Sequence, residues 1–179
     1  GIFNFEGEFI GFLGKLSKYM EDLKIGYSGN LESFVRFYKE NYYLTDRVSG
    51  KIYKYDKNFN LLDSIDVFEI NLSIPQVDYT KEPLKYILEA VRNNFFRYII
   101  DFFIDDDICY VLLKEHGFPF LYEINRKNNE IRKTLLPTKV GKEGKINYYF
   151  LNKINKEVSI IAILEDADKT FYCEVKVIK

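Results

Sequence analysis

Acidic side chains and one imidazole are the groups in this sequence whose types and spacing suggest chemistry. His116 is the single histidine and precedes Gly117, which favours a turn over a catalytic base. Asp105-Asp106-Asp107 and the segment 165–168 offer the oxygen ligands that calcium prefers. Three adjacent carboxylates do not converge by themselves, and the second segment lacks the glycine and glutamate of an EF-hand loop. We therefore expect turns, no catalytic residue and no metal site, with calcium as the one cofactor left open.

The two cysteines, Cys109 and Cys173, lie inside apolar runs at 108–113 and 171–178. Buried free thiols are the favoured interpretation, and a disulfide is the alternative, because pairing requires geometry that spacing does not supply. The compartment stays open on this evidence. The sequence also has no Cys/His cluster at metal-ligand spacing, no glycine-rich phosphate loop and no Gly-x-Ser-x-Gly elbow.

Aromatic residues are abundant, with 15 Tyr, 16 Phe and no Trp. The pairs Tyr42-Tyr43 and Tyr148-Tyr149 are candidates for a carbohydrate or peptide platform, because an aromatic face offers a large contact area with a polar tip. Adjacent strand residues point to opposite faces. The favoured expectation is therefore that one tyrosine of each pair lies between sheets and the other lies near the surface.

Short apolar runs separated by turn residues predict the elements that position these side chains. Residues 33–67 contain four such runs, which predict a four-stranded antiparallel meander. Asp56 can accept hydrogen bonds from the following turn, where Asn58 and Asn60 tolerate left-handed conformations. A second meander is expected at 95–136 and three strands in the last segment. The expected strands are 33–38, 41–45, 51–56, 61–67, 95–104, 108–114, 119–124, 130–136, 145–151, 157–164 and 170–178.

The remaining segments carry weaker patterns. Residues 2–5 and 8–13 predict two strands around Gly7, which can supply a positive φ. Residues 83–94 have helical spacing with Leu84 and Leu88 on one face, and an extended strand is the alternative. The connector 14–31 is expected to contain a helical turn at 17–25 or an irregular loop.

Residues 52–56 align with residues 121–125 and 2–6, which indicates a weak internal repeat. Each meander is apolar on both faces, and stacking sheets around an axis would cover them. We therefore predict an all-β fold of antiparallel four-stranded meanders arranged as β-propeller blades. A single domain over 1–179 would hold about three blades, with 33–67 and 95–136 the clearest. Residues 2–13 are a candidate to complete the sheet of the last segment.

The motif Ile52-Tyr53-Lys54-Tyr55-Asp56 with its asparagine-rich turn resembles the blade signature of NHL-type and TolB-like six-bladed β-propellers, especially those of Bacteroides and its relatives. The resemblance implies a periplasmic, cell-surface or secreted location, and it carries no catalytic residues to transfer. A six-bladed ring needs roughly 240 residues or more. The alternatives are a fragment of a longer protein, a homodimeric ring, or another β fold such as a sandwich or open barrel.

Two classes of function follow from this resemblance. The favoured one is a non-catalytic binding or scaffold module for a protein, peptide or glycan. The alternative is a metal-dependent lactonase or esterase, which would require residues such as Asp46, Asp56, Asp101 and Asn125 to meet at one metal. A structural domain within a larger assembly is a third reading.

The remaining composition narrows the class of partner. A net charge of -1 argues against a nucleic-acid partner. The sequence contains no run of about 18 apolar residues, so it predicts no membrane span. No signal peptide is recognised, and because the chain begins with Gly1, a natural start further upstream is expected.

Overall fold

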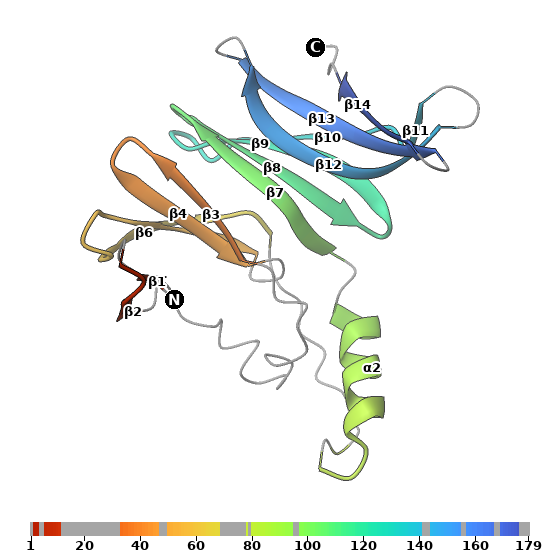
Figure 1. Ribbon diagram of the computed structural model, residues 1–179, viewed down its shortest axis with the longest axis horizontal. Coiled ribbons are helices and arrows are strands. Elements are labelled where there is room, and N and C mark those ends of the chain that lie inside the picture. The colour runs from red at the N-terminus through yellow and green to blue at the C-terminus, as the bar shows by residue number, and fades with distance from the viewer. Residues whose placement is uncertain are drawn as a thin grey trace. The chain divides into compact units, whose positions relative to one another are not determined.

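The computed structural model describes residues 2–3, 6–11, 33–46, 50–68, 78, 80–94, 97–140, 144–154, 157–166 and 169–175. They form antiparallel β-sheets and one helix, which confirms the predicted all-β class (Figure 1). The chain divides into two compact units, Gly1–Asn93 and Asn94–Lys179, here called unit 1 and unit 2. The arrangement of the two units as one propeller-like domain stays a prediction.

Unit 1 contains the predicted first meander. Strands β3 (Ser33–Tyr38), β4 (Asn41–Asp46), β5 (Lys51–Tyr55) and β6 (Leu61–Asp66) pair in the order β3-β4-β5-β6. Tyr43, Thr45 and Ile52 are buried. Strands β1 (Ile2–Phe3) and β2 (Phe9–Gly11) form a separate two-stranded sheet, and Gly7 between them has the expected positive φ of 84°.

Backbone geometry in the turns of unit 1 partly differs from expectation. Asp56 caps its turn as predicted, since Oδ1 accepts from the backbone N–H groups of Asn58 at 2.8 Å and Asn60 at 2.9 Å. The left-handed residue is Phe59, with φ of 65°, and neither asparagine. The reason is that both asparagines donate to the Asp56 carboxylate, so the left-handed step falls on the residue between them.

The helix α2 (Pro83–Asn94) is confirmed with its predicted bounds. The turn before it is closed by Asp78, whose carbonyl accepts from the N–H groups of Lys81 and Glu82. The helix face that was expected to be apolar is not buried where Leu84 and Leu88 lie. Their side chains are 70% and 59% exposed. Tyr86, which points away from that face by helical spacing, is buried instead. No helix among the described residues is long and apolar enough to cross a membrane.

Unit 2 consists of two four-stranded meanders. The first contains β7 (Arg97–Asp105), β8 (Ile108–Glu115), β9 (Phe118–Asn125) and β10 (Ile131–Leu135), in the order β10-β9-β8-β7. The second contains β11 (Lys139–Val140), β12 (Gly144–Ile154), β13 (Glu157–Asp166) and β14 (Lys169–Val175), in sequence order.

The fourth strand of the second sheet corrects one expectation. The described residues of 2–13 form a sheet of their own, in which β1 pairs with β2, and β11 is the fourth strand of the second sheet of unit 2. Two residues are too few to show an alternating pattern, so the sequence carries no signal for β11.

The two meanders of unit 2 share one apolar core. Leu112 and Leu121 of the first sheet, together with Leu136, pack with Ile146, Tyr149, Leu151, Ile160 and Ala162. Asp101 adds a polar link next to a register shift in β7. Its Oδ2 atom accepts from the N–H of Leu151 on β12, and its Oδ1 atom accepts from the N–H of Phe102, each at 2.8 Å. This buried carboxylate therefore ties the two sheets together.

Candidate functional site

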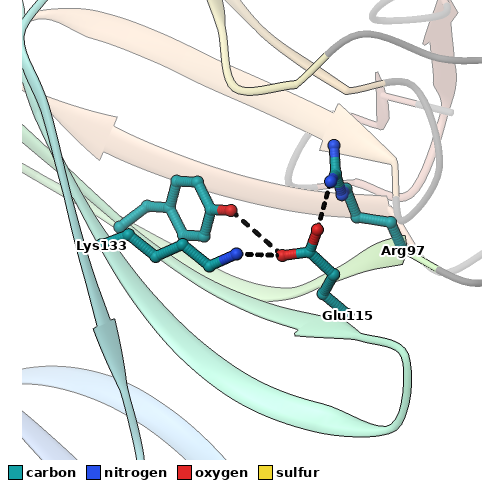
Figure 2. A network of polar contacts seen from close by, with 4 residues as sticks. Arg97, Glu115 and Lys133 are labelled. Atoms are coloured by element: carbon teal, nitrogen blue, oxygen red, sulfur yellow. Dashed lines mark hydrogen bonds and ion pairs between the residues drawn. The ribbon is translucent and has the colours of Figure 1, made fainter.

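The most concentrated group of ionised side chains in the described residues surrounds Glu115 at the end of β8. Figure 2 shows its carboxylate between Arg97 and Lys133. One oxygen accepts from the Arg97 guanidinium, and the other accepts from Lys133 Nζ at 2.5 Å and from the Tyr122 hydroxyl at 3.2 Å. We call these four residues the Glu115 cluster.

Strand register explains how residues far apart in the sequence meet in this cluster. Arg97 on β7 is the cross-strand partner of Glu115 on β8. Tyr122 on β9 is the partner of Lys133 on β10. Side chains of directly paired residues share a face of the sheet. Each strand of the meander therefore contributes one member, and the cluster spans the full width of the sheet.

The electrostatics of Glu115 limit what it can do chemically. The residue is only 7% exposed, and burial by itself would raise its pKa. Hydrogen bonds from Lys133 and Arg97, and their charges, outweigh that effect and lower the pKa to about 2. The hydrogen bond that Lys133 donates to Glu115 raises the pKa of Lys133. Glu115 is therefore ionised at neutral pH and is suited to holding the two cations in place, not to proton transfer.

Two aromatic rings of β9 lie beside Lys133 of the cluster. Lys133 Nζ lies 4.1 Å from the ring centre of Phe120 and 5.5 Å from that of Tyr122. Cations over aromatic faces are stabilised by the ring quadrupole. The Lys133 side chain thus lies against the rings of β9 while remaining 41% exposed.

Unit 1 presents a second candidate surface, made of three aromatic rings in contact at tilted angles. The Tyr42 ring lies 5.1 Å from the Phe37 ring and 5.3 Å from the Phe59 ring, centre to centre. Phe37 is 64% exposed, and Val35, two residues away on the same face of β3, is 51% exposed. We call Phe37, Tyr42 and Phe59 the aromatic row.

Each tyrosine pair has one buried and one more exposed member, as expected. Tyr43 and Tyr149 are buried, whereas Tyr42 is half-buried and Tyr148 is 61% exposed. Tyr149 donates its hydroxyl to the carbonyl of Pro137, and burial, with the nearby Cys173, raises its pKa to about 12. Tyr42 contacts the rings of Phe37 and Phe59 in the aromatic row.

The residues proposed to meet at a metal instead accept backbone hydrogen bonds where the structure describes their side chains. Asp56 lies in unit 1 and caps its own turn, and its hydrogen bonds with Asn60 lower its pKa. Asp101 and Asn125 lie in unit 2, where Asn125 accepts from the N–H of Lys127. The side chain of Asp46 lies outside the described residues. No group of three or more His, Cys, Asp or Glu side chains suited to a metal occurs in the described parts of the chain.

The acidic run 105–107 forms the predicted turn between β7 and β8. Its side chains meet cations, since Lys153 lies 2.6 Å from Asp105 and Lys127 lies 2.5 Å from Asp107. His116 is exposed in the turn between β8 and β9, as expected. The side chains of 165–168 lie outside the described residues.

Both cysteines are free thiols, as expected, but only Cys109 is buried, so the expected burial is wrong for Cys173. Cys109 is fully buried, and burial raises its pKa to about 12. Cys173 is only half-buried and packs at the margin of the unit 2 core. The protonated, buried Cys109 thiol is unsuited to nucleophilic chemistry.

Sequence reasoning did not identify the Glu115 cluster. Its members are three ordinary charged residues and a tyrosine, and the two cationic partners each lie 18 positions from Glu115 along the chain. One signal was present: Lys114 and Glu115 end the apolar run 108–113, and a carboxylate that is buried requires a partner. The partners become visible only when strand register is known.

Comparison with protein-family models, with curated proteins and with solved structures gave no match. The resemblance to NHL-type and TolB-like propellers therefore stays a prediction.

Proposed function

We propose that this protein is a non-catalytic binding module, of propeller-like type, for a protein, peptide or glycan ligand. The observation that supports the proposal is the aromatic row, which offers an exposed ring surface on the four-stranded sheet of unit 1. A periplasmic or cell-surface location, implied by the propeller resemblance, belongs to the same proposal.

The physical argument rests on the exposure of Phe37. A ring that is 64% exposed and packed at a tilt against a second ring leaves apolar area in contact with water. Covering that area with the face of a sugar or with an apolar side chain releases water and gains ring contacts. Leu61, which is 58% exposed, and Val35 extend the apolar content of this sheet.

A binding screen tests the proposal. The purified chain is incubated with an array of glycans and with a library of extended peptides, and bound ligands are then titrated by calorimetry. We expect at least one ligand class to bind, and the substitution Phe37→Ala to weaken that binding about tenfold or more, as for a central aromatic contact.

Tyr172→Ala is the matched control, because Tyr172 is an aromatic residue of similar exposure, 67%, on β14. It should leave binding unchanged. Binding that survives Phe37→Ala, or that is lost equally in both variants, would contradict the assignment to the aromatic row. An absence of binding in both screens would contradict the proposed class of function.

A further inference from the structure

The outer edge of β10 has a regular arrangement of backbone groups. Among the described strands, β10 pairs only with β9. The N–H of Asn125 donates to the carbonyl of Glu130, and the N–H of Leu136 donates to the carbonyl of Pro119, each at 2.9 Å. In an antiparallel ladder, alternate residues direct both backbone groups to the same side. Residues 130, 132, 134 and 136 therefore face β9, and 131, 133 and 135 face outward.

The side chains of these three residues, 131, 133 and 135, lie on the same face of the sheet. Ile131 is 47% exposed, Leu135 is 59% exposed, and Lys133 lies between them. Phe120 is the cross-strand partner of Leu135, and Phe118, two residues from it on β9, is 55% exposed. The edge thus presents two apolar side chains with a cationic side chain between them, beside two phenyl rings.

Charge indicates what this edge would accept. Lys133, the central outward residue of this edge, is a cation that remains 41% exposed beside its ion pair with Glu115. An acidic residue opposite Lys133 would therefore be favoured, and a basic one disfavoured.

Charge also argues against a second copy of β10 as the occupant. An antiparallel pair of two β10 strands that uses all three outward residues places Lys133 opposite Lys133 of the other copy. Like charges directly opposite each other destabilise a strand pair. This leaves a strand of different sequence as the better occupant.

We propose that the outer edge of β10 binds an extended segment of a partner protein, which adds a fifth, antiparallel strand to the sheet. The backbone groups of Ile131, Lys133 and Leu135 pair with alternate residues of that segment, which carries an acidic residue between two apolar residues. The inference does not use the aromatic row, so either proposal can fail while the other stands.

A synthetic peptide with the core Val-Thr-Glu-Thr-Val is the probe, titrated into the full chain labelled with nitrogen-15. We expect the peptide to bind and to slow hydrogen exchange at the amides of Ile131, Lys133 and Leu135. Two matched peptides serve as controls. One carries Lys in place of Glu and should bind about tenfold more weakly, as expected for a reversed cross-strand charge. The other is N-methylated at Glu, which removes a ladder hydrogen bond.

Protein variants separate the backbone contribution from the side chains. Ile131→Pro removes one outward N–H at the first residue of an edge strand, where proline is tolerated, and should weaken binding. Ile131→Thr retains the N–H, and Arg132→Ala changes a side chain on the opposite face. Both should bind more tightly than Ile131→Pro, with circular dichroism verifying that every variant is folded.

Several results would overturn the proposal. These are an absence of binding, equal binding of the Glu and Lys peptides, or protection at amides other than those of β10. Equal binding by Ile131→Pro and Ile131→Thr would also overturn it. A dimer in light scattering that Ile131→Pro converts to monomer would assign the edge to a second copy instead.

Discussion

At the scale of single residues, the Glu115 cluster shows how a carboxylate can be almost buried and still ionised. Transfer of a charge out of water is costly unless partners compensate for it. Arg97, Lys133 and Tyr122 supply that compensation from three different strands. The same partners leave Glu115 unsuited to acid–base chemistry.

The lowered pKa of Glu115 predicts a stability that depends on pH. The folded-state pKa of about 2 lies below the ordinary value of 4.5. The contribution is therefore fully present above about pH 4.5 and is lost as the pH falls toward 2. We expect Glu115→Gln to lower the free energy of unfolding at pH 7 by about 2 kcal/mol and to flatten its decline in acid.

Urea unfolding monitored by circular dichroism between pH 7 and pH 2 measures this effect. Glu157→Gln, at an exposed position at the start of β13, is the control and should follow the wild-type curve. If Glu115→Gln also follows the wild-type curve across this range, the ion pairs do not stabilise the fold.

At the scale of elements, the hairpins are set by short turns with left-handed residues. The turn between β3 and β4 is Lys39-Glu40, with φ of 45° and 63°. The turn between β8 and β9 is His116-Gly117, with φ of 49° and 87°. Positive φ at both central residues matches the twist of a two-residue hairpin, and glycine adopts it at least cost.

This geometry predicts a stabilising substitution in unit 1. Glycine at position 40 removes the steric cost of a left-handed residue that has a Cβ atom. We expect Glu40→Gly to raise the free energy of unfolding by about 0.5–1 kcal/mol, because the turn no longer carries this steric cost.

Thermal unfolding of Glu40→Gly beside Lys57→Gly tests the expectation. Lys57 is exposed in a turn and does not have a positive φ, so glycine there should slightly lower the melting temperature. A melting temperature that falls in both variants would show that the left-handed turn carries no steric cost.

At the scale of the whole molecule, each unit has its own sheets, and unit 2 has a core between two of them. Leu112 and Ala162 are fully buried, and Asp101 joins β7 to β12 through a backbone N–H. The packing of unit 2 therefore relies on both of its meanders.

Truncation of Leu112 is expected to disturb both sheets of unit 2. Leu112→Ala removes buried apolar volume and should cost about 2–5 kcal/mol. Hydrogen exchange by NMR should quicken for amides in β8 and also in β12 and β13. Leu135→Ala removes a side chain that is 59% exposed and should leave these amides unchanged. An effect of Leu112→Ala confined to β8 would mean that the two sheets do not stabilise each other.

Much of the local structure could be predicted from the sequence, because period-two alternation and turn residues act over short distances. The predicted strands of both meanders, the helix at 83–94 and the turn at Asp56 all appear in the structure. The prediction of a helix face at Leu84 and Leu88 was less successful. Helical spacing shows which side chains lie together, but not what covers them.

The sequence alone determined where strands begin and turn back, since backbone dihedral preferences and apolar alternation are local properties. Only the tertiary structure decided which charged residues meet. Glu115 finds Arg97 and Lys133 through strand register, and a shift of one residue would move each side chain to the other face. The aromatic row and the outward edge of β10 depend on the same register. Both candidate binding surfaces are therefore products of strand pairing, which short-range patterns do not encode.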